Sequence, residues 1–519
     1  MNKEKELQTA GKLAPELKHW THPAQAVVDL KPSAGAWQHI GVAKVCPAEM
    51  LPDQILRKDS KIILDFGETL VGKVRLRLDS WRSIDSPVRL ELLAAELPYE
   101  ASQDPETYKS TGLGCGWLQQ DLVTSYELPD EIEIPYRWSL RYLVIRVTAC
   151  PSCGVKIAGA EVIAQSAAGE ALPPPLPGFD RELTLIDRTA SRTLRNCLQD
   201  FPEDGPKRDR RLWLGDLRLQ ALVNHVTFRR YDQIERGIRL LAACRNEQGM
   251  IPAAIMMKPE IHASSFILDY ALLFPVLLLE HCRFSCNLKP GKELFDAAAH
   301  QLSFFRAGLD ETGNFHDPGE CWIFIDHCVI DRTTALSCVA IRSAESLAEL
   351  AELLKHPAKQ IRTLKKEAAA WRKALRETAF DPAEGLLRSG SAGQISWASQ
   401  IWGVLAGVLT PEEGRTALSK LKSLPSAIAP QTPYLMHYFL EACRSCGMEE
   451  LLQYTIRQYW GGMIRRGADT FWEVYREGDD FFTPYGNEVR SNSACHAWSG
   501  TPGYFLRTPA GEDGLRSKA

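Results

Sequence analysis

The chain has 519 residues, of which 45% are hydrophobic and 24% charged, and its formal net charge is −4. This balance excludes wholesale disorder, and the length predicts two to four domains whose cores need no disulfide or metal to hold them. The 61 basic and 65 acidic side chains form no polybasic run, so we expect no nucleic-acid partner.

The N-terminal sequence MNKEKELQTAGKLAPELKHW contains no apolar segment typical of a secretory signal. The longest apolar run, YALLFPVLLLE at 270–280, is shorter than the ~18 residues expected of a membrane span. Without an export signal, the 14 cysteines are predicted to be reduced thiols. We therefore expect a cytoplasmic protein with no membrane partner, and the sequence leaves its oligomeric state open.

From about residue 26 to residue 167 the sequence pattern is typical of β structure. Apolar residues alternate with polar ones in short runs, and Gly, Pro, Asp and Ser separate the runs. This pattern predicts an antiparallel β-sandwich, which we assign to residues 1–170 with a short N-terminal extension. The clearest runs are KIILDFG (61–67), KVRLRLDSW (73–81), VRLELLAAEL (88–97), YLVIRVTA (142–149) and GAEVIAQS (159–166).

A proline-rich connector, ALPPPLPGFD at 171–180, marks the domain boundary, and the period then becomes helical. Periodicity predicts an all-α domain over 181–519, and twelve helices arranged as six hairpins would form an (α/α)6 toroid. The predicted helices lie near 183–198, 217–230, 233–246, 262–281, 291–308, 333–355, 358–378, 396–408, 412–423, 432–446, 448–465 and 492–506.

Several short motifs point to no chemistry. The glycine-rich GLGCG at 112–116 lacks the last glycine of a dinucleotide fingerprint, because Trp117 occupies that position. The CxxC pairs at 150–153 and 443–446 are too far apart for a zinc ribbon. Neighbours such as Cys495 and His496 rarely present both side chains to one substrate. We expect neither a metal site nor a cofactor.

The densest polar cluster is DGPKRDRRLWLGD at 204–216, between the first two predicted helices. It holds three carboxylates, four cations and a tryptophan. One interpretation is a self-neutralising surface loop. The other is a sugar site, in which carboxylates bind hydroxyls and Trp213 lies beneath the ring, because functional residues concentrate on loops supported by a scaffold.

Three further clusters combine tryptophan with an acid or an imidazole near a predicted helix end. They are ADTFWE at 468–473, SNSACHAWSG at 491–500 and ECWIFIDH at 320–327. Glycosidic hydrolysis uses two carboxyl groups, one protonated and one ionised. Asp209 and Glu473 are candidates for this pair, since a toroid brings its first and last hairpins together.

These motifs carry a family resemblance. The segment that begins D-x-P-x-R-[acid] at Asp204 and ends G-D at Asp216, followed by T-x-W-E at 470–473 and by His496, resembles the α-L-rhamnosidases of glycoside hydrolase family 78. The resemblance covers nearly the whole chain, and ILDFGETLVGKVRLRL at 63–78 is similar to the β-sandwich that precedes the barrel in that family. It implies a compact member with a six-hairpin glycosidase barrel.

The resemblance also implies roles for individual residues. Asp209 falls at the position of the general acid, and Glu473 at that of the general base, which activates water for inversion. Asp204 and Asp216 match carboxylates that hold hydroxyls of the rhamnose ring, and Arg208 matches an arginine beside them. The remaining candidates for substrate binding are Trp213, Trp322, Asp326 and Trp472 around the pocket and His496 near the −1 sugar.

Two positions depart from the family pattern. The usual acid is Glu, so Asp209 is one methylene shorter, and Gly205 replaces a usual cysteine. A misplacement on the scale of one C–C bond can cost ~100-fold in rate unless the pocket has adapted. For Trp322 and Trp498, core packing is the alternative to a pocket role.

The sequence thus predicts an inverting exo-glycosidase that removes terminal α-L-rhamnose, or a related 6-deoxy sugar, from oligosaccharides or glycosides. One alternative is a polysaccharide lyase on a helical toroid, with Tyr485 and His496 as its proton-transfer pair. Another is a non-catalytic carbohydrate-binding protein, which the change from Glu to Asp at position 209 allows.

Overall fold

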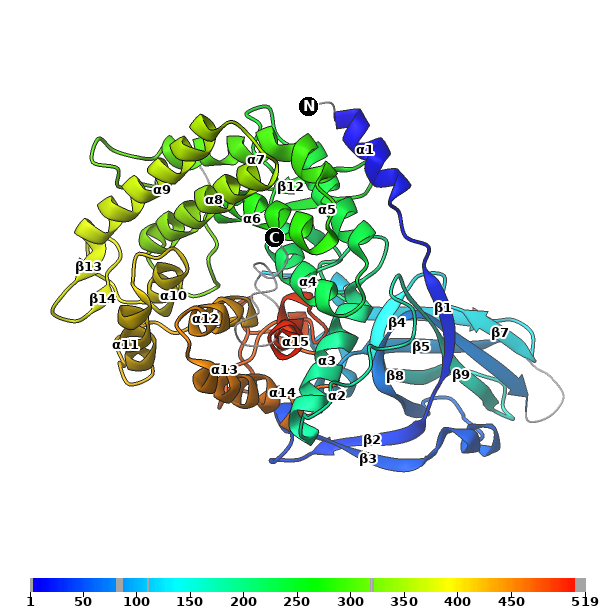
Figure 1. Cartoon of the computed structure of the whole chain (residues 1–519). Coiled ribbons are helices and arrows are strands. Elements are labelled where there is room, and N and C mark those ends of the chain that lie inside the picture. Colours follow the sequence, from blue (N-terminus) through cyan, green and yellow to red (C-terminus); the bar gives the residue numbers. More distant parts are fainter. Residues whose placement is uncertain (1–2, 81–86, 110–111, 318, 320–321, 509–519) are drawn as a thin grey trace.

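The computed structural model describes residues 3–80, 87–109, 112–317, 319 and 322–508. An antiparallel β-domain is followed by a helical domain (Figure 1), which confirms the predicted fold class. Trp81, Glu320 and Cys321, which belong to predicted motifs, lie outside the described residues.

The β-domain is organised around one long strand, β4 (Lys61–Ser80). It merges two predicted strands, and its register shifts between Asp65 and Leu70. Before the shift β4 pairs with β2 and β8, and after it with β8, β7 and β9, so that it joins four neighbouring strands of the sheet. The other strands are β1 (Lys18–Pro23), β2 (Ala26–Pro32), β3 (Ile40–Pro47), β5 (Val88–Ala95), β6 (Gln119–Ser125), β7 (Asp130–Glu133), β8 (Trp138–Ala149) and β9 (Val155–Ser166).

The core of this domain follows from the alternation along its strands. In β4, Leu64, Phe66, Val74 and Leu76 are buried and face the same cluster of apolar side chains. A smaller cluster on the other face of the sheet lies against α2 (Pro98–Ser102). Burial of alternate residues is what the period of two predicts for a sheet with a packed face.

The helical domain begins where the proline-rich connector ends, because the Asp180 side chain accepts a hydrogen bond from the Leu183 N–H at 2.9 Å and caps α3. Most of the predicted helices are present within a few residues. They are α3 (Arg181–Cys197), α4 (Leu214–Val226), α5 (Tyr231–Ala243), α6 (Leu268–Ser285), α7 (Lys289–Arg306), α8 (Thr333–Leu353), α9 (Ala358–Ala379), α10 (Trp397–Leu405), α11 (Pro411–Leu421), α12 (Pro433–Ser445), α13 (Glu449–Thr455), α14 (Gly461–Arg465) and α15 (Pro502–Arg507).

Three predicted helices differ from the structure. Residues 262–265 form strand β12 (His262–Ser265), which pairs with β11 (Ala254–Met256), itself paired with β10 (Leu212–Trp213). The helix predicted over 448–465 is broken by a π-helical turn, η5 (Ile456–Trp460). Over 492–506 only η7 (Ala497–Gly500) and α15 are helical, because residues before η7 bond to the 471–473 segment instead.

Within the described residues the helices form two concentric layers. The inner helices α4, α6, α8, α10 and α12 contact one another in succession, and η7 with α15 closes the ring between α12 and α4. Helices α5, α7, α9, α11 and α13 pack outside them, and α3 backs η7 and α15 (Figure 1). Helix α6 is buried almost all round, which explains its apolar run at 270–280. Across the described ranges, we find no helix with the length and apolar character needed to span a bilayer.

The N-terminal helix α1 (Lys3–Lys12) packs on α5 of the helical domain, although the β-domain follows it in sequence (Figure 1). Glu6 forms an ion pair with the buried Arg239 at 2.7 Å. Arg236 donates a hydrogen bond to the carbonyl of Ala10. The first residues of the chain therefore stabilise the barrel rather than the sheet.

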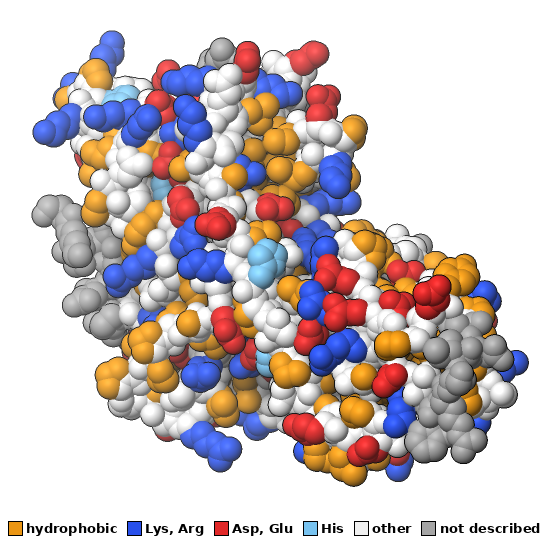
Figure 2. All heavy atoms as spheres, turned by 90° about the vertical axis from the view of Figure 1, so that its right-hand side faces the viewer, with side chains coloured by type: hydrophobic (Ala, Val, Ile, Leu, Met, Phe, Trp, Pro, Cys, Tyr) orange, Lys and Arg blue, Asp and Glu red, His pale blue; other side chains and the backbone are white. Residues whose placement is uncertain are grey.

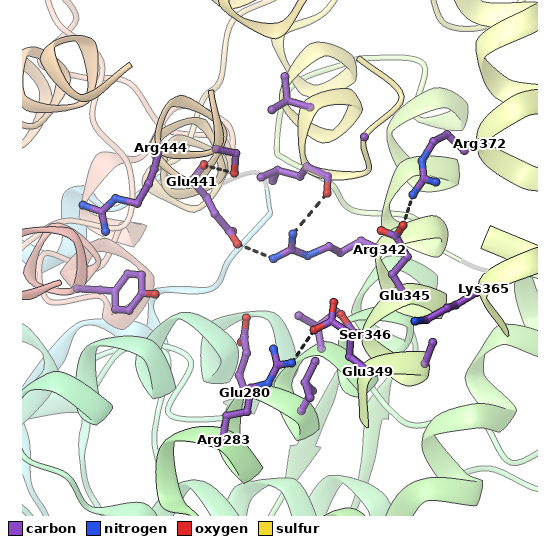
Figure 3. A pocket seen from close by; sticks show the side chains of 18 of the residues that line it. Glu280, Arg283, Arg342, Glu345, Ser346, Glu349, Lys365, Arg372, Glu441 and Arg444 are labelled. Carbon is purple, nitrogen blue, oxygen red and sulfur yellow. Dashed lines mark hydrogen bonds and ion pairs between the residues drawn. The ribbon is translucent and has the colours of Figure 1, made fainter. Parts of the chain in front are cut away.

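A cavity of about 640 Å³ lies among the C-terminal halves of the inner helices (Figure 3). Its arginines are engaged by neighbouring acids: Arg283 with Glu349 at 2.7 Å and Arg342 with Glu441 at 2.9 Å. Cations at this end also suit the partial negative charge of helix C-termini. The polar lining of this cavity is thus explained by the architecture of the barrel.

Figure 2 shows one face of the molecule, on which basic and acidic side chains are interspersed. This distribution agrees with the near balance of 61 basic and 65 acidic residues.

Candidate functional site

The segments that the sequence analysis singled out meet at the N-terminal ends of the inner helices. Residues 204–213 lead into α4, residues 322–327 precede α8, and residues 470–473 and 491–496 precede η7. The cavity of Figure 3 lies at the opposite, C-terminal ends of these helices. Helix N-termini carry partial positive charge, which favours a cluster of carboxylates at this end of the barrel.

The 204–211 segment is held in shape by its first residue. The Asp204 carboxylate accepts hydrogen bonds from the backbone N–H of Asp209 and of Arg211, both at 3.0 Å. The Asp204 carbonyl accepts another from Ala497 at 2.7 Å. Residues 204–208 are buried, so the interpretation as a solvated surface loop is wrong.

Gly205 stands where this segment passes closest to the 493–495 segment. A Cβ at this position would lie 2.4 Å from the Arg208 carbonyl oxygen and 2.8 Å from the Ser493 Oγ. This backbone arrangement therefore leaves no room for a side chain at position 205.

Arg208 joins the two candidate catalytic carboxylates. Its Nη1 is 3.1 Å from Asp209 Oδ1, and its Nη2 donates to both oxygens of Glu473, at 2.6 and 2.5 Å. Its Nε donates to the Ser491 carbonyl at 2.7 Å, and its guanidinium lies 4.4 Å from the centre of the Tyr485 ring. The first and last hairpins of the barrel thus converge on one buried arginine.

Glu473 is buried and surrounded by hydrogen-bond donors. Besides Arg208, the Tyr485 hydroxyl donates to Oε1 at 2.5 Å and the Ser493 N–H donates to Oε2 at 2.8 Å. Burial acts to raise the pKa of Glu473, but the charge of Arg208 outweighs it and brings the pKa to about 2. Glu473 is therefore ionised at neutral pH.

Asp209 lies at the open side of the cluster. Its side chain is 17% exposed, compared with 2% for that of Glu473. The Arg211 guanidinium is 3.9 Å from its second carboxylate oxygen. Of the cations in the 204–216 segment, Arg208 and Arg211 face Asp209, whereas Lys207 and Arg210 point to the β-domain.

His496 lies between Asp204 and Asp216. Its Nε2 is 3.9 Å from Asp204 and its Nδ1 is 3.7 Å from Asp216. Burial lowers the pKa of His496 to about 3, so its ring is neutral at pH 7. Burial and the neighbouring Asp209 raise the pKa of Asp204 to about 7, and burial with Asp204 raises that of Asp216 well above its usual range. The three groups form a cluster of low charge beside the ionised Glu473.

Aromatic side chains line the same end of the barrel. Trp498 packs on His496 at 4.3 Å between ring centres and is almost fully buried. Phe324 stacks 6.3 Å from Trp498 and connects it to Trp322, which is 52% exposed. Trp213 meets the buried Tyr270 edge to face at 6.4 Å. Core packing thus accounts for Trp498, whereas Trp322 and Trp213 remain accessible.

Two predicted pocket residues point elsewhere. The carboxylate of Asp326 accepts hydrogen bonds from the Gln431 N–H and the Thr432 hydroxyl, both at 2.6 Å, and so tethers the start of α12. Trp472 packs against Trp37 of the β-domain, with 4.7 Å between ring centres. Both residues lie next to the site in sequence, but their side chains serve packing.

Tyr485 and His327 are part of the site, although the sequence analysis gave neither a role in hydrolysis. The Tyr485 hydroxyl, which donates to Glu473, lies 3.3 Å from His327 Nε2. A tyrosine in a loop and a histidine beside Asp326 carry no spacing signal that would connect them to Glu473. No group of three or more metal-ligating side chains occurs in the part of the chain that the structure describes.

Comparison with known proteins agrees with this geometry. Residues 24–164 match the family model of the glycosyl hydrolase family 78 alpha-rhamnosidase N-terminal domain. Residues 322–509 match that of the bacterial alpha-L-rhamnosidase 6 hairpin glycosidase domain. Among curated proteins no match was found.

Solved structures extend the comparison over the whole chain. A rhamnosidase from Klebsiella oxytoca with rhamnose bound is 35% identical, with a TM-score of 0.93, and the match covers 98% of this chain and 99% of that one. A family 78 rhamnosidase of Bacillus sp. GL1 has a TM-score of 0.73 at 20% identity, over 90% of this chain and 49% of that one. The latter shows the fold alone.

A β-sandwich followed by a six-hairpin barrel, with paired carboxylates at one end of it, defines a class of glycoside hydrolase. Within that class, the chain belongs to glycoside hydrolase family 78, the α-L-rhamnosidases. Membership of a hydrolase family decides against the lyase alternative.

Proposed function

We propose that the protein is an inverting exo-α-L-rhamnosidase that removes terminal rhamnosyl residues from oligosaccharides or glycosides. The observation that carries this proposal is the convergence of Asp209 and Glu473 on Arg208 at one end of the barrel. The rhamnose bound to the Klebsiella relative supports the choice of sugar. Hydrolysis with inversion needs one carboxyl group as acid and another as base on opposite sides of the bond.

In this proposal Glu473 is the general base. It is ionised at neutral pH, and its oxygens already accept bonds from Arg208, Tyr485 and Ser493. A carboxylate has about four lone-pair sites, so an attacking water must replace one of these donors. We expect the Tyr485 hydroxyl to give way, because Tyr485 is half-buried whereas Arg208 and Ser493 are buried.

Asp209 is the proposed general acid. Its backbone is fixed by Asp204, and its carboxyl group is the more exposed of the pair, as the group that meets the leaving oxygen must be. The accessible Trp213 and Trp322 are the proposed contacts to the sugar or its leaving group. We assign Asp204, Asp326 and Trp472 to positioning rather than to sugar contact, because their side chains are already occupied.

The test uses two rhamnosides, p-nitrophenyl α-L-rhamnoside and an alkyl α-L-rhamnoside. Glu473→Gln is expected to lose about 100-fold or more in kcat on both, because water activation is needed for either substrate. Asp209→Asn is expected to lose far more on the alkyl rhamnoside, whose leaving group requires a proton, than on the p-nitrophenyl one. Asp479→Asn, which changes a half-exposed acid close to Glu473 in the chain, is the control and is expected to behave as wild type.

Proton NMR of the first sugar released decides the stereochemistry. Inversion of an α-rhamnoside gives β-rhamnose first, and α-rhamnose as the first product would contradict the proposal. Rhamnoside binding without release of sugar would instead favour the non-catalytic alternative. The cytoplasmic location stays a prediction, which fractionation of cells would check.

A further inference from the structure

Beyond the barrel, buried polar side chains of the β-domain reach the two segments that carry Asp209 and Glu473. Glu96 directly follows β5, and its carboxylate accepts hydrogen bonds from the Ser139 hydroxyl and from the backbone N–H of Ala494, both at 2.6 Å. Glu96 and Ser139 are buried. A carboxylate of the sheet thus holds the segment whose neighbouring Ser493 N–H binds Glu473.

Lys207 forms the second connection. Its Nζ lies 2.9 Å from Glu100 Oε1 in α2 and donates to the Asn492 carbonyl at 3.1 Å. The Lys207 side chain is 2% exposed. The other oxygen of Glu100 accepts the Glu96 N–H at 3.1 Å, so the two glutamates are linked to each other.

Two more contacts hold the ends of the 203–210 segment, which carries Arg208 and Asp209. Arg137, just before β8, pairs with Glu203 at 2.5 Å, and the Glu203 carbonyl accepts a hydrogen bond from Gln220 of α4. Arg210 donates to the side-chain oxygen of Gln119 at 3.3 Å. Residues on both sides of Arg208 and Asp209 are therefore fixed to the β-domain.

Burying these charged side chains costs hydration free energy, so stability alone does not account for the arrangement. Buried ion pairs lose hydration and often contribute no more than apolar residues of similar volume. They do define geometry, because a buried charge tolerates few positions. Lys207 is the direct neighbour of Arg208, and Asn492 and Ala494 flank Ser493, so the geometry they define is that of the two carboxylates.

We propose that Glu96, Glu100 and Lys207 are positioning residues, through which the β-domain sets the placement of Asp209 and Glu473 for catalysis. The inference rests on the proposed function and adds to it that the β-domain is part of the catalytic apparatus. It acts through Arg208 and the Ser493 N–H, without contact with the sugar.

The experiment compares wild type with Glu100→Gln/Lys207→Met in the full-length chain, using p-nitrophenyl α-L-rhamnoside. Replacing both partners avoids leaving one buried charge unpaired, so the fold is expected to survive. We expect kcat to fall about 10- to 100-fold, because misplacement of reacting groups by about 1 Å has effects of that size. KM is expected to stay within about threefold, since the sugar contacts are unchanged.

A matched control is Glu68→Gln, which weakens the interdomain ion pairs with Arg192 (2.9 Å) and Arg195 (3.3 Å) without touching the 203–211 or 491–496 segments. It is expected to keep kcat within about twofold. Melting temperatures and far-ultraviolet circular dichroism of all variants show whether the folded fraction is the same. A second variant, Glu96→Gln, is expected to lower kcat in the same way, because the Ser139 and Ala494 bonds go to different oxygens of Glu96 and the amide has a donor in place of one of them.

The outcomes are distinct. Wild-type kcat in the folded double variant and in Glu96→Gln overturns the positioning role and leaves the rhamnosidase proposal intact. A loss of kcat in Glu68→Gln equal to that in the double variant also overturns it, because any interdomain contact would then have the same effect. No sugar release by wild type contradicts the proposed function itself.

Discussion

Among single residues, Glu473 shows most clearly how burial and charge are balanced. Its pKa of about 2 in the folded protein lies below the ordinary 4.5, because Arg208 outweighs the effect of burial. A depressed pKa means that the ionised side chain contributes to stability above about pH 4.5. That contribution is lost as the pH falls from 4.5 through 2.

We therefore expect the stability difference between wild type and Glu473→Gln to depend on pH. At pH 7 wild type should be the more stable by an amount on the order of 3 kcal/mol, and the difference should shrink steadily below pH 4.5. Urea unfolding at pH 7, 5, 4 and 3 measures it. A difference that is constant over this range would show that Arg208 does not hold Glu473 in its ionised form.

Gly205 gives a second prediction for a single residue. Gly205→Ala places a methyl group against the Arg208 carbonyl, so we expect the free energy of unfolding to fall by about 1–3 kcal/mol and kcat to fall with it. Gly114→Ala is the control, because nothing lies within 4 Å of its added methyl group. Chemical denaturation and initial rates test both variants. Equal behaviour of the two would contradict the steric argument.

The types of the site residues could be predicted from the sequence, but their directions could not. Asp326 and Trp472 stand beside His327 and Glu473 in the chain, yet one tethers α12 and the other packs on the β-domain. Tyr485 reaches Glu473 from a loop without any periodic pattern. Which way a side chain points depends on tertiary contacts that spacing does not encode.

At the level of whole elements, most helices were predictable because each buries either one apolar face or, like α6, nearly its whole surface. The helix predicted over 492–506 is wrong before η7, since the small and apolar residues there are buried at the end of the barrel that carries Asp209 and Glu473 rather than on a helical surface. Strand β4 appeared as two runs because its register shift interrupts the alternation. A local sequence pattern predicts the wrong element where tertiary contacts determine the backbone conformation.

Helix α1 gives a prediction for an element. Glu6 is buried against Arg239, which also pairs with Glu235 and Glu293. Glu6→Ala removes one of three partners, so we expect a loss of about 1.5–3 kcal/mol in unfolding free energy with kcat unchanged. Glu16→Ala, at an exposed position after the helix, is the control. Thermal unfolding measures the stability of both variants. An unchanged stability of Glu6→Ala would show that the contact of α1 with the barrel does not stabilise the fold.

For the whole molecule, buried polar contacts between the domains imply joint unfolding. Lys207 with Glu100 and Arg137 with Glu203 would both be broken if either domain opened alone. We expect one calorimetric transition at pH 7, with calorimetric and van't Hoff enthalpies in agreement. Two separate transitions would contradict this. Cleavage within the exposed 171–180 connector should leave both fragments associated, which size-exclusion chromatography would show.

The separation of the two ends of the barrel has a practical consequence. The proposed catalytic carboxylates lie at the N-terminal ends of the inner helices, whereas the cavity of Figure 3 and the exposed thiol of Cys286, just after α6, lie at the other end. In a variant whose other exposed thiol among the described residues, Cys115, is replaced by serine, we expect a solid support or a fluorescent label coupled through Cys286 to leave the proposed site accessible. The protein can thus be immobilised at the C-terminal ends of the inner helices while the opposite end stays in contact with solvent.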